Sequence, residues 1–282
     1  MSRAYRFDRY LCRAPGDSVV RGLRGADGDD PDPERFRAQH AAYGAALEAA
    51  GGAVEVLPAL DDYPDSVFIE DAALCIGDTA IALRPGAPSR AGEVAEVVPA
   101  LKRCFGRVVN LDGPGTVDGG DVLVTETHAF VGLSSRTDRG GFEALASILD
   151  GLGLSAQPVG LPYGVLHLKS DCGLLDENTI FATPRLAASG CFAGYDVIET
   201  PDGEAAAANL VRVNDVVLIA KGFRQTAALL SSKGYRVETV AVGEAAKLDG
   251  GLSLYVVADA DVLRGARNAV GGRVTLSVTR AA

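Results

Sequence analysis

Short apolar runs occur along the chain in pairs, and each pair is separated by a short polar turn. "ALCIGDTAIALRP" contains one such pair around Gly77-Asp78, which predicts a β-hairpin. A helical stretch follows from about Arg90 to Cys104, and "RVVNL" then has the composition of a strand. A hairpin, a helix and a strand therefore form one predicted unit.

The same order occurs three more times at a period of roughly 40–50 residues, which indicates internal repetition. The next unit begins with "DVLVTETHAFVGLS" and continues with a helix over about 138–152 and the strand "AQPVGL". "CGLLDENTIFATP" turns at Glu177-Asn178 and precedes a poor helix near Leu186 and the strand "YDVIET". "ANLVRVNDVVLIAKG" turns at Asn214-Asp215 and leads to a helix over about 225–233 and the strand "YRVETVAV".

The two ends of the chain supply a fifth unit. A strand after Gly251 can pair with the N-terminal "AYRFDRYLCRA", which is followed by a helix from Pro33 to Ala50 and the strand "AVEVLPA". Joining the first and last units closes a ring, and closure removes exposed sheet edges. No linker divides the chain, so we expect one α/β domain over 1–282, in which "LYVV" can supply the fifth unit's short strand. Residues 254–282 form an atypical tail, and we expect it to be poorly packed beyond about Asp259.

Composition narrows the function classes. The net charge of −10 argues against nucleic acid as the main partner, and the 48% of hydrophobic residues indicates an ordinary globular chain. An acidic chain also suits a cationic small substrate, although acidity for solubility is the plainer explanation. No apolar stretch is long enough to span a membrane, and the five cysteines are scattered without a CxxC pair. We therefore expect a cytoplasmic protein without disulfides or a cysteine-rich zinc site.

The stretch "YPDSVFIEDAA" gathers Asp65, Glu70 and Asp71 around Phe68. In a strand, Ser66, Phe68 and Glu70 would face one way and Asp65 the other. Carboxylates bind guanidinium N–H groups in pairs, and an aromatic face attracts a cation, so this cluster could hold a planar cation. The alternative is a solvated acidic loop.

Four further features could carry chemistry, and each has a plainer structural explanation. "GPGTVDGGDVL" places Asp118 and Asp121 around a Gly pair that alone predicts only a tight turn. His167 is expected in an apolar strand, "GVLHLKSD", where a histidine is usually a core residue. Arg90 and Arg136 lie at strand–helix junctions, where they could bind a carboxylate bidentately or simply lie on the surface.

Taken together and in this order, seven segments resemble the dimethylarginine dimethylaminohydrolase family: "PDSVFIEDAALC", "RPGAPSRAGE", "PGTVDGGDVL", "SSRTD", "VLHLKS", "AAANLVRVN" and "KLDGGLS". The resemblance runs from about Arg13 to Ser253. It implies a five-bladed α/β propeller (the pentein fold) of ββαβ modules around a pseudo-five-fold axis. It also implies a small-molecule substrate, methylated arginine or a related guanidino amino acid, with no metal and no organic cofactor. Nucleic acid and membrane are not implied as partners, and a homodimer is compatible with the resemblance.

The resemblance also implies covalent chemistry. A cysteine thiolate attacks the guanidinium carbon, a histidine protonates the departing amine, and water activated by the same histidine completes the hydrolysis to citrulline. The matching residues here are His167 as general acid and base, Asp118 as the orienting carboxylate, Asp71 as the guanidinium ligand with Glu70 and Phe68 shaping its pocket, Asp65 and the backbone of Leu23 for the α-amine, and Arg90 with Arg136 for the α-carboxylate.

The family's cysteine falls at Leu254, and leucine cannot form the covalent intermediate. Cys172, five residues after His167, reads as a core residue. Three explanations remain open: a pseudoenzyme that only binds guanidino ligands, altered chemistry for which no nucleophile is evident, or a shift of reading frame. Reading the codons of "LYVVAD" one base later allows Cys-Met-Ser-Leu-Arg. We expect the intact gene product to be a hydrolase, and the chain with Leu254 to bind without turnover. The sequence does not decide which guanidino substrate is preferred.

Overall fold

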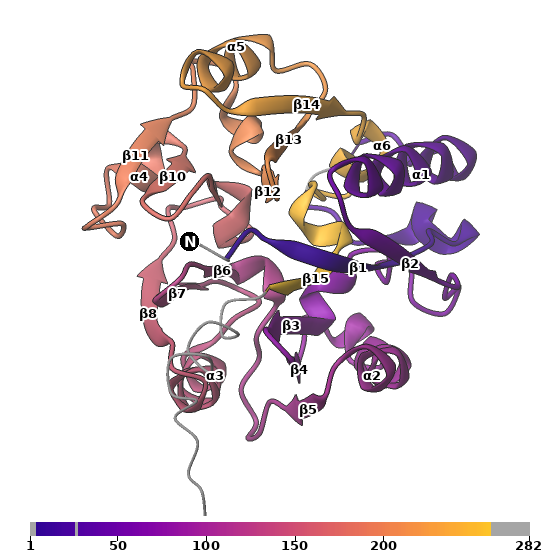
Figure 1. Ribbon diagram of the computed structural model, residues 1–282. Coiled ribbons are helices and arrows are strands. Elements are labelled where there is room, and N and C mark those ends of the chain that lie inside the picture. The colour runs from indigo at the N-terminus through magenta and orange to yellow at the C-terminus, as the bar shows by residue number, and fades with distance from the viewer. Residues whose placement is uncertain (1–3, 26–27, 261–282) are drawn as a thin grey trace, which may run out of the picture.

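The computed structural model describes residues 4–25 and 28–260. The described strands form five three-stranded sheets, which surround a central axis as the blades of a propeller (Figure 1). Each blade has an antiparallel strand pair, and its third strand runs parallel to the second after a helical crossover. The predicted five-bladed α/β propeller of ββαβ units is confirmed.

Four blades follow one another along the chain. Each hairpin and strand predicted from the apolar runs is present. The strands are β3 (Ala73–Ile76), β4 (Thr79–Ala82) and β5 (Arg107–Asn110); β6 (Val122–Val124), β7 (His128–Leu133) and β8 (Ser155–Gly160); β9 (Cys172–Leu174), β10 (Thr179–Ala182) and β11 (Asp196–Glu199); β12 (Val211–Val213), β13 (Val216–Ala220) and β14 (Arg236–Val240).

The helices lie around the rim of the ring (Figure 1). Asp32 and Asp138 cap α1 and α3 by accepting the backbone N–H three residues later, and Glu204 accepts two N–H groups at the start of α5. The short α4 agrees with the poor helical sequence there. The helices are α1 (Pro33–Ala49), α2 (Glu93–Cys104), α3 (Arg139–Gly151), α4 (Pro184–Ala187), α5 (Arg224–Ser232) and α6 (Gly243–Ala246). Within the described residues, none of these is long and apolar enough to cross a bilayer.

The fifth blade joins the two ends of the chain. Strand β1 (Phe7–Arg13) pairs in parallel with β2 (Ala53–Leu57) and antiparallel with β15 (Val257–Ala260). This confirms the predicted ring closure. The strand begins later than the expected "LYVV", because Ser253–Tyr255 form a 3-10 turn. The expectation of poor packing beyond Asp259 falls almost wholly on residues outside those described.

A single 3-10 turn precedes the first strand of every blade. These turns lie next to one another, with the turn of 69–72 in contact with those of 119–121 and 253–255. They correct two expectations: Asp65–Glu70 do not form a strand, and His167 immediately precedes a 3-10 turn. The turns are Ile69–Ala72, Gly119–Asp121, Leu168–Ser170, Ala205–Ala208 and Ser253–Tyr255.

Asn214, at the turn between β12 and β13, fastens this blade to the closing blade. Its backbone has φ = 52°, a left-handed conformation that Asn tolerates better than most residues. Its side chain accepts the Phe7 N–H and donates to the carbonyls of Phe7 and Ala50. The predicted turn residue therefore also stabilises ring closure.

Tyr255 is a large, fully buried residue in the core beneath α1. Its ring contacts those of Phe36, His40 and Tyr43 and stacks on Phe68, with ring centroids 5.8 Å apart. No other described residue forms a hydrogen bond with its hydroxyl group. A buried polar group without a partner costs about 1–3 kcal/mol, so this side chain packs well but carries an unfavourable oxygen.

We predict that Tyr255→Phe raises the free energy of unfolding by about 1 kcal/mol, because it removes only the unpaired hydroxyl. Tyr195→Phe is the matched control: its hydroxyl donates to Thr125 Oγ1 at 2.8 Å, and its removal should lower stability by about 1 kcal/mol. Urea denaturation of both variants gives the two values. A clear loss of stability in Tyr255→Phe would show that the hydroxyl has a partner in solution.

Candidate active site

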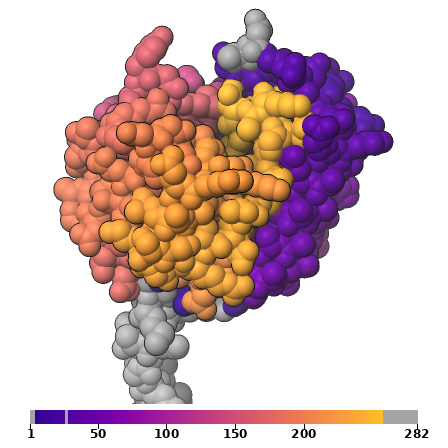
Figure 2. Space-filling model, turned by 90° about the horizontal axis from the view of Figure 1, so that it is seen from above, coloured from indigo at the N-terminus to yellow at the C-terminus, as the bar shows by residue number. Residues whose placement is uncertain are grey.

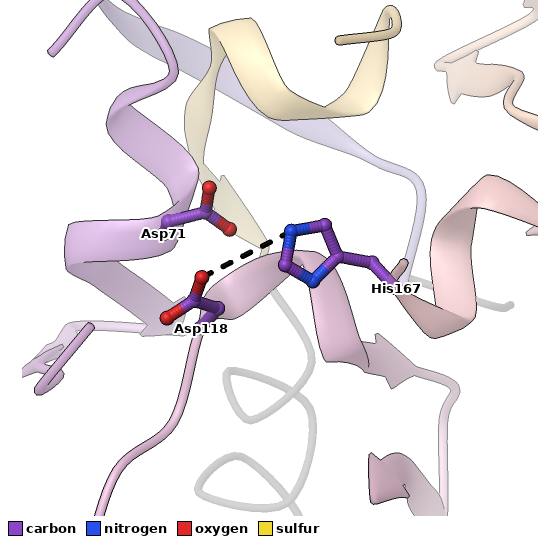
Figure 3. A group of neighbouring side chains, drawn as sticks. All are labelled: Asp71, Asp118 and His167. Carbon is purple, nitrogen blue, oxygen red and sulfur yellow. Dashed lines mark ion pairs between the residues drawn. The ribbon is translucent and has the colours of Figure 1, made fainter. Parts of the chain in front are cut away.

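Gly120 belongs to one of the five 3-10 turns, and side chains that lie in or beside three other turns meet around it. A β-carbon added to this glycine would lie 2.9 Å from Leu254 Cδ2, 3.0 Å from His167 Cγ and 3.1 Å from Asp71 Oδ1. Only a residue without a side chain fits between them. Figure 3 shows Asp71 and Asp118 directed toward the imidazole of His167. The closed propeller thus brings together residues that lie up to 183 positions apart in the sequence, from 71 to 254.

His167 lies between two carboxylates. Its Nε2 is 3.9 Å from Asp118 Oδ2, and its Nδ1 is 3.4 Å from Asp121 Oδ2. Burial opposes protonation of the imidazole, but the interactions with Asp121, Asp71 and Asp118 outweigh it, so the pKa of His167 is raised. The ring is thereby suited to hold a proton near neutral pH and to deliver it from Nε2.

Asp121 lies beside Nδ1 of His167, a contact that the motif did not reveal. Its Oδ1 accepts the Leu168 N–H, and its Oδ2 accepts the hydroxyls of Ser134 and Thr137. These bonds fix the fully buried carboxylate beside Nδ1 of His167. The sequence signal was present, since Asp121 follows Asp118 across the Gly pair, but two acids near a turn do not tell which one faces the imidazole.

Asp118 is buried with one oxygen free for chemistry. Its Oδ1 accepts the Gly86 N–H at 2.7 Å, while Oδ2 has no hydrogen-bond donor among the described residues. Burial, together with the negative charge of Asp71, raises the pKa of Asp118 to about 7. This carboxyl group can therefore exchange a proton at physiological pH.

Asp71 is held by Arg90 beneath the site. Arg90 Nη1 lies 2.5 Å from Asp71 Oδ2, and Gly120 N–H donates to Asp71 Oδ1. Although burial favours the neutral acid, the guanidinium charge lowers the pKa of Asp71. Asp71 is thus the firmly ionised carboxylate at the centre of the group.

The geometry of Arg90 differs from its expected role. The side chain is 4% exposed and also binds Glu93 and the carbonyl oxygens of Asp65 and Phe68. In this structure it is the counter-ion of Asp71 and Glu93 and not an open site for a ligand carboxylate. A buried guanidinium with two carboxylates is stable only when its hydrogen bonds are satisfied, and these contacts satisfy most of them.

Two residues expected to shape the guanidinium pocket are also occupied elsewhere. The ring of Phe68 is buried against Tyr255, so one of its faces is covered. Glu70 forms an ion pair with Lys169, and burial raises its pKa to about 7 against the lowering effect of that lysine. In this structure both side chains are therefore occupied by contacts within the protein.

The residues expected to bind the α-amine and the second expected α-carboxylate ligand, Arg136, each have one close contact in the structure. Leu23 N–H donates to Asp65 Oδ1 at 2.9 Å, so the sequence correctly brought these two residues together. Burial raises the pKa of Asp65. Arg136 remains 20% exposed, with its Nη1 4.0 Å from Asp118 Oδ2. Arg136 is therefore less tightly paired than Arg90, which is buried against two carboxylates.

The "DGG" motif before position 254 has a separate reason for each residue. Asp249 has φ = 56° and accepts the Gly25 N–H. A β-carbon at Gly250 would lie 2.4 Å from the ring of Phe68, and one at Gly251 would lie 2.4 Å from Oδ1 of Asn209. Both glycines are therefore needed for close approach, and together they deliver Leu254 to its place.

Cys172, five residues after His167, does not replace the thiol expected at Leu254. Cys172 lies in β9 with 1% exposure, and its thiol donates to the Leu168 carbonyl. Burial raises its pKa well above the usual value, which suppresses the thiolate that a nucleophile requires. Its interpretation as a core residue agrees with this geometry.

Asp71, Asp118 and His167 each place one potential ligand atom within 4.8 Å of the others. Such a trio could in principle accommodate a divalent cation. Both Asp71 oxygens are already bonded, one to the Arg90 guanidinium and one to Gly120. The adjacent guanidinium charge opposes a resident divalent cation at this trio.

A cavity of about 670 Å³ is lined by Asn209 and by residues within two positions of Arg136, His167 and position 254. Figure 2 shows this face hollowed between the pink and the yellow segments. Its lining includes chain neighbours of the site: Gly25, Ser135, Leu166, Ser170, and residues 249–252. The volume lies in the range of small-molecule sites.

The fold and site define a five-bladed α/β propeller with a buried histidine–carboxylate centre where the blades meet. No protein-family model matches the chain. N(G),N(G)-dimethylarginine dimethylaminohydrolase of Pseudomonas aeruginosa is 36% identical over 248 residues, covering 88% of this chain and 97% of the relative. The protein of the same name from Streptomyces coelicolor is 36% identical over 247 residues, covering 86% and 93%. The chain belongs to the dimethylarginine dimethylaminohydrolase family.

Solved structures agree with this assignment. A complex of the Pseudomonas aeruginosa enzyme with citrulline, in a cysteine-to-serine variant, superposes with a TM-score of 0.87 at 35% identity and covers 90% of this chain and 100% of that one. A histidine-to-glycine dimethylarginine dimethylaminohydrolase, as an adduct with S-methyl-L-thiocitrulline, gives 0.86 at 35% identity and covers 89% and 99%.

We predict that Asp118→Asn stabilises the protein most strongly at alkaline pH. The folded-state pKa of about 7 exceeds the value of about 3.9 in an unfolded chain, so ionisation costs stability as pH rises through this interval. The advantage of the variant should grow by roughly 2 kcal/mol between pH 5.5 and pH 8.5.

Urea denaturation of both proteins at the two pH values measures this change. Asp62→Asn, on the exposed surface, controls for loss of one acidic side chain and should show no such growth. An advantage that is constant with pH would mean that Asp118 is ionised throughout.

Proposed function

We propose that this protein has the site of a dimethylargininase-type hydrolase for N-omega-methylated arginine. With Leu254, the chain binds such guanidino amino acids without turning them over. The observation that carries the proposal is the meeting of Leu254, His167 and Asp71 around Gly120. A nucleophile at position 254 would lie beside His167, which can donate a proton, and beside the Asp71 carboxylate, which can bind the N–H groups of a guanidinium.

The chemistry follows from this arrangement if position 254 carries a thiol. The thiolate forms an S–C bond to the guanidinium carbon, the C–N bond to methylamine or dimethylamine breaks, and His167 gives the departing nitrogen its proton. Water then attacks the S-alkylthiouronium carbon and passes a proton to His167. The C–S bond breaks, which releases citrulline and restores the thiolate. Asp121 and Asp118 stabilise the imidazolium form between the two steps.

Recognition of the rest of the ligand rests on charge complementarity. Asp71 offers an ionised carboxylate to the guanidinium group, and Asp65 with Leu23 is suited to the α-amine. Arg136, which retains exposure, is the candidate for the α-carboxylate. We assign Arg90 a supporting role under Asp71 unless ligand binding releases it from Glu93.

A binding protein without catalysis is the second candidate, and Leu254 itself favours it. The leucine is 5% exposed and belongs to the buried core around Tyr255 and Phe68, so its side chain is accommodated without loss of the surrounding charges. A pocket that keeps its ligands but lacks a nucleophile would bind and release methylated arginine unchanged.

We predict that Leu254→Cys gains hydrolase activity that the natural chain lacks. Loss of a covalent nucleophile typically removes several orders of magnitude in rate, so the variant should exceed the parent by at least about 1,000-fold in citrulline formation from dimethylarginine. Adding His167→Gln to that variant should abolish the gain. Turnover by the parent at rates near 1 per second would instead require another nucleophile.

The gene sequence around codon 254 is the companion measurement. If omission of one base near that codon yields a cysteine at position 254, the leucine reflects a shifted frame. If the shifted frame encodes no cysteine there, the frame-shift explanation fails, and the protein with Leu254 that binds without turnover is favoured.

We predict that the chain with Leu254 binds methylated arginine, as measured by calorimetry. Arg136→Ala should weaken binding at least about tenfold, because a charge-assisted pair contributes about 1.5–3 kcal/mol. Arg139→Ala, three residues away at the start of α3, is the matched control and should leave the affinity unchanged. Absence of heat with arginine and with both methylated forms would contradict the binding site itself.

A further inference from the structure

Asn209 is the residue that the turn of the remaining blade contributes to the centre. Four of the 3-10 turns place Asp71, Asp118, His167 and Leu254 in or beside the group described above. The turn Ala205–Ala208 ends at Asn209, which is buried, with 9% exposure. Position in the repeat therefore directs attention to this amide, for which neither the family resemblance nor the proposed chemistry supplies a role.

The amide of Asn209 joins the two segments on which the proposed chemistry depends. Its Oδ1 accepts the Ser253 N–H at 3.2 Å, and its Nδ2 donates to Ser253 Oγ at 3.1 Å. Nδ2 also donates to the carbonyl of Lys169 at 2.8 Å. Ser253 immediately precedes position 254, and Lys169 follows His167 by two residues, so one side chain spans both.

Gly251 makes this clamp close-fitting. A β-carbon there would lie 2.4 Å from Oδ1, 2.5 Å from Cγ and 2.9 Å from Nδ2 of Asn209. Backbone and amide are therefore in direct contact, and the segment 251–253 has little freedom to move away. Lys169 is itself paired with Glu70, which precedes Asp71, so the same contacts extend to a third turn.

We infer that Asn209 is a positioning residue that sets the separation between the side chain at position 254 and the imidazole of His167. It touches neither the proposed substrate nor the reacting atoms. Its effect is exerted through the Ser253 backbone on one side and the Lys169 carbonyl on the other. This inference rests on the proposed function, because the separation matters chemically only when position 254 carries a nucleophile.

The pKa of a thiol introduced at position 254 reports this separation directly. A protonated imidazole lowers the pKa of an adjacent thiol, whereas the Asp71 carboxylate, which also lies beside Gly120, raises it, and both effects fall off with distance. The starting protein is Leu254→Cys in the full chain. The rate of iodoacetamide alkylation at position 254, resolved by peptide mass spectrometry across pH 5–10, gives the thiol pKa separately from the native cysteines.

Asn209→Leu has a similar volume but makes none of the three hydrogen bonds. We expect it to raise the thiol pKa by about one unit and to reduce alkylation at neutral pH several-fold. Gly251→Ala displaces the amide from the other side and should shift the pKa in the same direction. This second variant keeps the test decisive if Asn209→Leu does not fold.

Asn214→Gly is the matched control, because it removes another three-bond asparagine that joins two blades while keeping a residue suited to φ = 52°. It should lower the melting temperature without changing the thiol pKa. If this control changes the thiol pKa equally, the effect at Asn209 comes from a general loss of stability, and the positioning role is overturned.

The remaining outcomes separate the two proposals. A thiol pKa that is low, rises on His167→Gln, and does not respond to Asn209→Leu or Gly251→Ala overturns the positioning role and leaves the proposed function intact. A thiol pKa that does not respond to His167→Gln would mean that the charge of the imidazole does not act on position 254, which would overturn the positioning role. Citrulline formation by Leu254→Cys then decides whether the proposed function stands.

Discussion

Ring closure by β1 is the constraint on which the site depends. This strand pairs with β2 on one side and with β15 on the other, so the last described blade contains both ends of the described chain. The turn of 253–255 thereby lies against those of 69–72 and 119–121. Without this pairing, position 254 would not meet His167 or Asp71, and the fifth sheet would expose an edge.

The same closure buries charges that would be unstable alone. Asp71 is ionised because Arg90 lies against it, and Arg90 is tolerated because Glu93 and two backbone carbonyls complete its hydrogen bonding. Asp118 has only longer contacts with cationic groups, since Arg136 Nη1 and His167 Nε2 lie 4.0 Å and 3.9 Å from its Oδ2, and burial raises its pKa to about 7. Stability and chemistry are opposed at this residue, as is usual where carboxylates share a buried site.

Leu254 is compatible with the fold and incompatible with covalent chemistry. Its side chain lies beside Gly120 and packs in an apolar cluster, so the core accommodates it. Tyr255, by contrast, buries a hydroxyl without a partner among the described residues. Upstream, Gly250, Gly251 and Asn209 maintain a close-fitting approach to position 254. The backbone before position 254 is thus held by closer contacts than the packing of a leucine side chain requires.

The repeat and its closure were predictable from the sequence, because alternating apolar runs, turn residues and helical stretches are local signals. Gly77-Asp78 and Asn214-Asp215 turn as expected, and the helices end within three residues of their predicted bounds. The family motifs likewise indicated candidate side chains, of which Asp71, Asp118 and His167 lie close together. These features depend on the order of residues along the chain and on the conformations that those residues prefer.

The roles of individual charges required the tertiary structure. The strand expected at Asp65–Glu70 and the one expected at His167 are turns, because these segments enter the axis and do not cross a blade. Arg90 and Asp71 are 19 residues apart and Asn209 and Ser253 are 44 apart, so no local pattern pairs them. Sequence by itself determined the blades and the set of candidate residues. Only the closed ring decided that Asp121 faces Nδ1 of His167 and that Arg90 serves Asp71, because hydrogen bonds and burial depend on distances between blades.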